Sequence, residues 1–265
     1  MKKGILLAAH GSSNSAANSA LDYLLNKVAA EYPNIPIQKA YTSNHILKAL
    51  SKQGKHSPSI KGTLKEMNDE GITHIVIQSL HVIPGSEFEN ITLIISDIDC
   101  EDYTFKKAIT GQPLLTNIQE IDEVSDIILT ALPERDPEND ALILVAHGSR
   151  HSENGSNIYK NFKYALEAKD KNAYMGRLNS QDDIVKIAAK IEASGQKKAF
   201  LLPLLFGAGN HVQKDMAGDH EESWKNIVSS KGIEAIPVIR GIGEFDIFAN
   251  RWMDNLRNAI KKLDG

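Results

Sequence analysis

Short apolar runs alternate with helical patterns along the whole chain. Runs of this length predict buried strands, here at residues 4–9, 35–42, 74–80, 103–109, 142–147, 173–178, 198–202 and 233–239. Helical spacing of apolar residues predicts helices at 14–32, 59–69, 90–97, 118–128, 154–168, 181–193 and 252–263, a helix beginning at residue 44 and a helical region ending at 228. Strands that alternate with helices predict parallel sheets with right-handed crossovers.

The first strand of the pattern is repeated later in the chain. Residues 4–13 read GILLAAHGSS and residues 142–150 read LILVAHGSR, so His10 in the first half takes the place of His147 in the second. In both copies a buried strand ends abruptly in a His-Gly-Ser turn before a helical segment. This arrangement places a histidine at the carboxyl edge of a parallel sheet.

A second repeated stretch follows in each half. Residues 77–87 align with residues 201–211 without a gap, and Glu87 then corresponds to His211. We therefore predict an α/β protein with two similar domains, each built on a parallel sheet, that arose by internal duplication.

Residues 133–140 read PERDPEND and are the most linker-like stretch of the chain. They hold two prolines and five charged residues and no large apolar side chain. We predict an N-terminal domain over residues 1–132 and a C-terminal domain over residues 141–265, with a last helix that could pack back on the first domain.

Composition narrows the class of protein. Of 265 residues, 42% are hydrophobic and 24% are charged, which is typical of a globular protein. The net charge of −4, without a block of basic residues, argues against a nucleic-acid partner. Cys100 is the only cysteine, and no apolar run approaches the roughly 20 residues of a membrane span. We expect a cytoplasmic protein without a membrane partner, and leave a homo-oligomer open.

His10, His147, Glu87 and His211 each follow a predicted strand. Open α/β sheets bind ligands outside the carboxyl ends of their strands, so these side chains are candidates for one site. Neutral imidazoles with one carboxylate suit Co, Fe, Ni or Zn. The positions are scattered, without HExxH or CxxC spacing, so the residues alone give the metal site only as a hypothesis.

Structural roles are open for the same residues. A histidine after a buried strand can serve only as a hydrogen-bond partner for a neighbouring loop, and Ser149 can serve as a helix cap. Glu87 can be an acid that favours a helix start, and Gly209 can be an ordinary loop glycine. His81 can simply pack in a wall, because its counterpart Leu205 is apolar.

Several stretches together resemble the anaerobic sirohydrochlorin cobaltochelatases. These are class II chelatases, which need no ATP and share a fold with protoporphyrin ferrochelatase. The likeness covers nearly the whole chain in order, and the stretches that carry it are 1–13, 40–43, 77–89 (IQSLHVIPGSEFE), 145–148, 202–204, 208–211 (AGNH) and 219–224.

The resemblance implies two flavodoxin-like, Rossmann-like domains of the chelatase type with a tetrapyrrole cleft between them. It also implies that His147 and His211 bind the metal and that Glu87 is the third ligand, and we assign catalysis to the same three residues. Other members use a glutamate where this chain has Asn179, which shifts weight to Glu87. His147 is expected to take the main role, as proton acceptor and ligand.

The implied substrate carries many carboxylates, whereas the protein is net acidic, so attraction must be local. Backbone amides at helix starts can supply it, with Arg150 nearby, and apolar side chains can stack on the ring. The expected substrate-binding residues are His10, Ser12, Ser43, Leu80, His81, Ser149, Arg150, Phe206 and Gly209.

We therefore expect a lyase that inserts Co²⁺ into sirohydrochlorin in anaerobic cobalamin (vitamin B12) biosynthesis, with Co²⁺ as substrate metal and no organic cofactor. The alternatives are the same reaction with Fe²⁺ or Ni²⁺, a non-catalytic carrier of tetrapyrrole or metal, and an unrelated metal-dependent hydrolase on the same fold.

Overall fold

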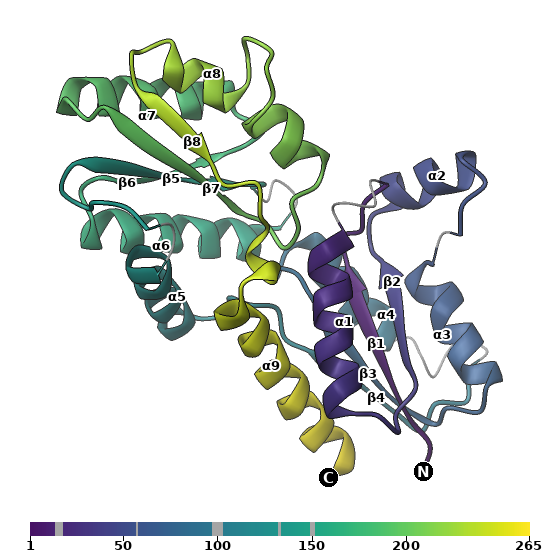
Figure 1. Cartoon of the computed structure of the whole chain (residues 1–265). Coiled ribbons are helices and arrows are strands. Elements are labelled where there is room, and N and C mark those ends of the chain that lie inside the picture. Colours follow the sequence, from purple (N-terminus) through teal and green to yellow (C-terminus); the bar gives the residue numbers. More distant parts are fainter. Residues whose placement is uncertain (14–17, 57, 97–102, 132–133, 149–151) are drawn as a thin grey trace. The chain divides into compact units, whose positions relative to one another are not determined.

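A computed structural model describes residues 1–13, 18–56, 58–96, 103–131, 134–148 and 152–265 (Figure 1). The chain divides into two compact units. The first is Met1–Leu114 together with Gly243–Gly265, and the second is Leu115–Ile242. No helix in the described part of the chain combines the length and the apolar character needed to cross a bilayer.

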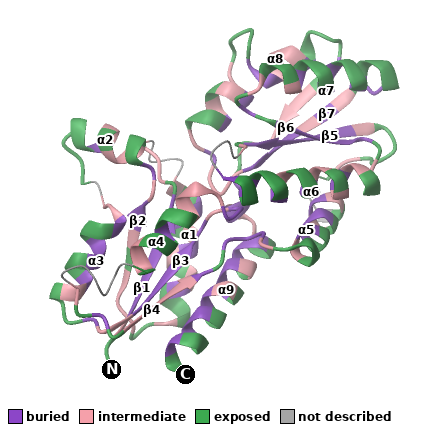
Figure 2. Ribbon diagram, turned by 180° about the vertical axis from the view of Figure 1, so that it is seen from behind, coloured by how far each residue is buried: buried purple, intermediate pink, exposed green. Residues whose placement is uncertain are grey.

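The first unit is built on a parallel sheet with the strand order β2-β1-β3-β4. Its strands are β1 (Lys3–Ala9), β2 (Ile37–Tyr41), β3 (His74–Ser79) and β4 (Lys107–Gly111), and its helices are α1 (Ser19–Glu31), α2 (Asn44–Lys52), α3 (Ile60–Asp69), α4 (Ser86–Ser96) and α9 (Asp246–Asp264). Leu64 of α3 and Ile91 of α4 share one apolar cluster with Leu6 and Ile77 of the sheet. In Figure 2 the central strands β1 and β3 are mostly purple, because they are buried, whereas most of β4 is pink.

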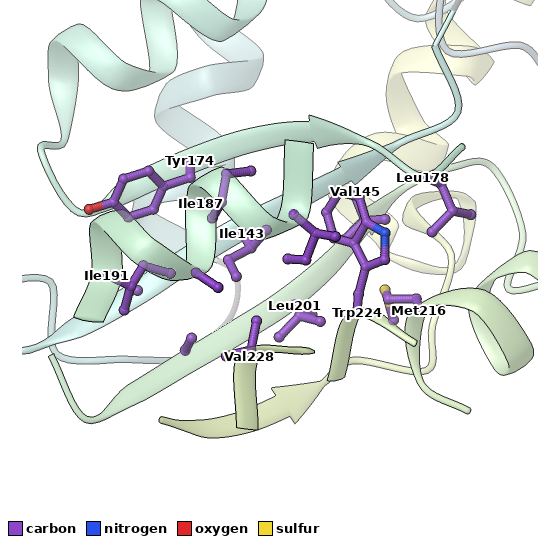
Figure 3. Packing of buried hydrophobic residues seen from close by; sticks show 14 of the residues in the cluster. Ile143, Val145, Tyr174, Leu178, Ile187, Ile191, Leu201, Met216, Trp224 and Val228 are labelled. Carbon is purple, nitrogen blue, oxygen red and sulfur yellow. The ribbon is translucent and has the colours of Figure 1, made fainter. Parts of the chain in front are cut away.

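The second unit repeats this plan with the strand order β6-β5-β7-β8, again parallel. Its elements are α5 (Ile118–Ala131), β5 (Asp140–Ala146), α6 (Glu153–Lys169), β6 (Ala173–Arg177), α7 (Gln181–Ser194), β7 (Lys198–Leu204), a π-helical turn η2 (His211–Met216), α8 (Trp224–Ser229) and β8 (Glu234–Pro237). A 3₁₀ turn, η3 (Ile242–Glu244), spans the boundary between the units. Figure 3 shows the core, in which Trp224 packs among Val145, Ile187 and Met216.

The two strand orders correspond position by position, and the predicted α/β class with two similar parallel-sheet domains is confirmed. The turn after the first strand of each unit also has the same backbone conformation. Gly11 and Gly148 both have a φ of +86°, a region that glycine adopts without strain. The same local sequence, His-Gly, thus gives the same glycine conformation after the first strand of each unit.

The units differ in extent from the predicted halves 1–132 and 141–265. Helix α5 packs against α6 and so belongs to the second unit, and α9 packs on β3 and β4 of the first. The predicted linker lies within the second unit, where the guanidinium of Arg135 pairs with Asp170 and donates to the carbonyl of Asp140. The predicted linker has few apolar residues, but this largely buried ion pair anchors it to the second unit.

Some predicted boundaries were wrong. Helix α4 begins at Ser86 instead of residue 90, and β4 lies at Lys107–Gly111 instead of 103–109. Helix α1 begins at Ser19, and part of its predicted first turn, residues 14–17, lies outside the described residues. The earlier start of α4 matters most, because it moves Glu87 from a loop into the first turn of a helix.

Candidate functional site

The first candidate cluster surrounds the carboxylate of Glu87. Oε1 lies 2.8 Å from Nδ1 of His10, which follows β1. Oε2 accepts a hydrogen bond of 2.5 Å from the Thr42 hydroxyl and lies 2.9 Å from Nε2 of His81. Because β1, β2 and β3 are parallel neighbours, the residues after them meet at one edge of the sheet, where α4 begins.

Burial and hydrogen bonding act in opposite directions on Glu87. Burial raises the pKa of this carboxyl, but the hydrogen bonds and charges of His10 and His81 outweigh burial, and the net pKa lies well below the usual range. Glu87 is therefore a carboxylate at neutral pH. An ionised carboxylate held at a strand edge is a suitable oxygen donor for a divalent metal.

The second candidate cluster is the pair His147 and His211. His147 follows β5, and His211 is the first residue of η2, after β7. Their rings meet edge to face, with centroids 5.3 Å apart and planes at 84°. Both residues are exposed. Two exposed imidazoles in contact place two nitrogen donors of the kind that zinc and similar metals bind at the carboxyl edge of the second sheet.

Asp215 orients His211 in this pair. Its Oδ2 lies 2.6 Å from Nδ1 of His211, one helical turn earlier in η2. A carboxylate only accepts hydrogen bonds, so Nδ1 carries the proton and the lone pair of the neutral ring is on Nε2. This is the arrangement in which a carboxylate fixes the tautomer of a metal-binding histidine.

Arg177 brings a positive charge to the same edge. It ends β6, and its side chain passes within 3.3 Å of the position that a Cβ of Gly148 would occupy. Its Nε and NH2 donate to Asp183 at 3.0 and 3.2 Å. Burial raises the pKa of the Asp183 carboxyl, but hydrogen bonds from Arg177 outweigh it and lower the pKa to about 2.

Known proteins decide the family. A family model described as cobalt chelatase (CbiK) matches residues 3–261. A sirohydrochlorin cobaltochelatase CbiKC from Nitratidesulfovibrio vulgaris is 32% identical over 265 residues, which are 99% of this chain and 92% of that relative. This chain belongs to the cobalt chelatase (CbiK) family. A sirohydrochlorin cobaltochelatase from Salmonella typhimurium is 24% identical over 262 residues, which are 98% of this chain and 97% of that relative.

Solved structures show that the CbiK fold seen here is a chelatase fold. The sirohydrochlorin chelatase SirB from Bacillus subtilis subspecies spizizenii, in complex with cobalt, superposes with a TM-score of 0.62 at 14% identity and covers 98% of this chain and 96% of that chain. The structure of CbiX, described as the terminal enzyme for siroheme biosynthesis in denitrifying bacteria, gives 0.58 at 16% identity and covers 97% and 99%. At these identities the likeness concerns the fold.

The structure groups the predicted metal ligands of this CbiK member into two sets, one in each unit. His10 and His81 contact Glu87 in the first unit, and His147 contacts His211 in the second. Within either unit, no three described His, Cys, Asp or Glu side chains are placed to hold a metal ion together. The three-ligand set stays a prediction.

The predicted substrate-binding residues differ in exposure. Ser43 precedes α2, but it is 6% exposed and its hydroxyl makes no cap hydrogen bond. Leu80 is 1% exposed, so its side chain belongs to the core of the first unit. Ser12, Phe206 and Gly209 are partly exposed. Ser149 and Arg150 lie outside the described residues.

Sequence reasoning missed the side chains that hold the predicted ligands. Thr42 and Ser79 contact Glu87 and His81 from strand ends, and Asp215 contacts His211. The spacing of four residues between Asp215 and His211 was a usable signal, because such residues are neighbours on a helix. Nothing in the residue pattern marked Thr42, since hydroxyl side chains are common after strands.

Proposed function

We propose that this protein inserts Co²⁺ into sirohydrochlorin without ATP, for anaerobic cobalamin biosynthesis. The observation that carries the proposal is the family match over residues 3–261, in a chain whose duplicated strand ends carry metal-binding side chains. The relative that is 32% identical over almost the whole chain bears the name of this reaction. The fold is that of sirohydrochlorin chelatases.

In this proposal His147, His211 and Glu87 hold the incoming Co²⁺. The two histidines are exposed and in contact with each other, and Asp215 leaves the Nε2 lone pair of His211 for the metal. Glu87 supplies a negative charge that offsets part of the metal charge. Nitrogen and carboxylate donors of this kind suit Co²⁺ without excluding Fe²⁺ or Ni²⁺.

Insertion also requires that two pyrrole protons leave the macrocycle. His147 is the proposed acceptor, because imidazole is the side chain that exchanges protons near neutral pH. Its position directly after β5 gives a backbone anchored in the sheet, while the side chain is exposed. His147 can therefore pass protons to water between turnovers without movement of the fold.

Mixing the purified protein with sirohydrochlorin and Co²⁺ tests the proposal. The absorption change of metal insertion should be far faster than the spontaneous reaction. His147→Ala and His211→Ala should each lower kcat/KM at least about 100-fold, which is about 3 kcal/mol of transition-state stabilisation. His45→Ala is the matched control, because His45 is an exposed histidine on α2.

Wild-type rates in both His147→Ala and His211→Ala would refute the assigned site. Sirohydrochlorin binding without acceleration by the wild-type protein would instead show a carrier. Competition among Co²⁺, Fe²⁺ and Ni²⁺ at equal free concentration then ranks the metals, and a clear preference for Fe²⁺ or Ni²⁺ would overturn the choice of Co²⁺ as substrate.

A further inference from the structure

The two halves of the duplication differ at the position beside Glu87. In the first half this position is His81, and its counterpart in the second half is Leu205. The side chain of His81 is 13% exposed, whereas that of Glu87 is 26% exposed, so the imidazole lies on the inner side of the carboxylate. A polar ring replaces an apolar side chain in a position that the fold fills with leucine elsewhere.

Polar contacts hold the ring of His81 at both of its nitrogens. Nε2 lies 2.9 Å from Oε2 of Glu87, and a carboxylate only accepts, so Nε2 carries a proton. Nδ1 lies 2.8 Å from the hydroxyl of Ser79, and that same hydroxyl accepts from the backbone N–H of His81 at 3.4 Å. The Ser79 hydroxyl therefore holds the ring at Nδ1, in the orientation that directs the Nε2–H at Glu87.

Thr42 also donates a hydrogen bond to Oε2 of Glu87. Its hydroxyl is 2.5 Å from Oε2 of Glu87 and 3.1 Å from Nε2 of His81. The backbone N–H of Thr42 donates to the carbonyl of Ala9 at the end of β1, so the hydroxyl is carried by the sheet. Oε2 thus receives donors from two strand ends, while Oε1 accepts one hydrogen bond, from Nδ1 of the half-exposed ring of His10.

We propose that His81, assisted by Thr42, is a positioning residue that holds Oε2 of Glu87, so that Oε1, on the side of the half-exposed ring of His10, is the oxygen that binds the metal. The proposal rests on the proposed role of Glu87 as a ligand. Carboxylates that bind metals in one orientation are in turn hydrogen-bonded, and removal of such a partner typically costs 10–100-fold in metal affinity or activity. Ser79 contributes indirectly, because its contact with Nδ1 holds the ring of His81 in this orientation.

The test measures KM for Co²⁺ and kcat at saturating sirohydrochlorin. His81→Leu copies the residue at the duplicated position, so it fills the space and removes the donor. We expect KM for Co²⁺ to rise about tenfold and kcat to change much less. His81→Gln should restore most of the affinity, because its amide N–H can reach Oε2. His45→Leu is the control for loss of an exposed histidine.

Two further variants separate this proposal from the assignment of Glu87. Glu87→Gln should raise KM for Co²⁺ at least as much as His81→Leu, and the double variant should behave like Glu87→Gln alone, because both changes act through one carboxylate. An unchanged KM in Glu87→Gln would overturn the ligand role. A raised KM in Glu87→Gln with an unchanged KM in His81→Leu would overturn only the positioning role.

A loss in His81→Gln as large as in His81→Leu would also overturn the positioning role, since it would show that ring shape and not the donor matters. Folding of each variant is checked by thermal unfolding in a Trp224→Phe background, where the remaining Trp252 lies in α9 of the same unit. A variant that is folded at the assay temperature gives a decisive answer in either direction.

Discussion

The paired turns at Gly11 and Gly148 allow one substitution to be tested in two environments. Both glycines have a φ of +86°, so alanine is strained at either position. They differ in what an added Cβ would meet. At Gly11 it would lie 2.5 Å from Cγ of the buried Tyr41 ring, and at Gly148 it would lie 3.3 Å from the side chain of the exposed Arg177.

The expected costs follow from these contacts. A left-handed backbone costs an alanine roughly 1–2 kcal/mol at either position. Overpacking against a fixed side chain adds roughly 1–3 kcal/mol, and we apply it only at Gly11, because Tyr41 cannot move away whereas Arg177 can bend into solvent. Gly148→Ala should lower the free energy of unfolding of the second unit by about 1–2 kcal/mol, and Gly11→Ala should lower that of the first by about 2–5 kcal/mol.

The chain offers a separate probe for each unit. It contains two tryptophans, with Trp252 in the first unit and Trp224 in the second. Urea unfolding in a Trp224→Phe background follows the first unit, and unfolding in a Trp252→Phe background follows the second. Each alanine variant is compared with its own single-tryptophan parent, because replacement of a buried tryptophan itself costs stability.

The reasoning fails if Gly148→Ala destabilises its unit as much as Gly11→Ala destabilises the other. It also fails if either variant is as stable as its parent, because the strain of the left-handed backbone is common to both. In a Tyr41→Ala background, Gly11→Ala should cost less than it does with Tyr41 present, which checks that the ring is the obstacle.

Three other changes test charges and contacts in the second unit. Asp215→Ala should raise KM for Co²⁺ about tenfold in the insertion assay, because His211 loses its orienting partner. Asp183→Asn should lower the free energy of unfolding in urea by about 2 kcal/mol at pH 7. Hydrogen bonds from Arg177 lower the pKa of the Asp183 carboxyl to about 2, so this stabilisation is present above pH 4 and is lost as the pH falls through 2. Arg135→Ala should cost about 3–5 kcal/mol by Trp224 fluorescence, because it leaves the buried carboxylate partner of Arg135 unpaired.

Much of the fold was predictable because strands and helices of this class have different hydrophobic periods. The repeated HGS turn placed His10 and His147 correctly after β1 and β5. The start of α4 was misjudged because residues 81–89 contain Pro84 and Gly85, which read as a loop, although the helix begins at Ser86, directly after Gly85. The last helix was predicted as one that could pack back on the first domain, and α9 does contact β3 and β4. The membership of α5 in the second unit was missed, since it depends on packing against α6.

The candidate site was predictable only where chemistry and repetition coincided. His147, His211 and Glu87 stand at positions that the duplication marks, and the histidine pair is in contact as expected for one site. The contact of His81 with Glu87 was missed because the comparison with Leu205 favoured packing. Leu205 shows that the fold accepts an apolar residue at this position. The histidine at the corresponding position 81 therefore indicates a role that the fold alone does not require.

Because α9 belongs to the first unit, the two units are completed in a different order from the one in which they begin during synthesis. The second unit is one continuous stretch, Leu115–Ile242, whereas the first needs Gly243–Gly265 to complete it. During synthesis, β3 and β4 cannot pack against α9 until the whole intervening second unit has been translated. The second unit can therefore fold before the first is complete, although the first unit begins the chain.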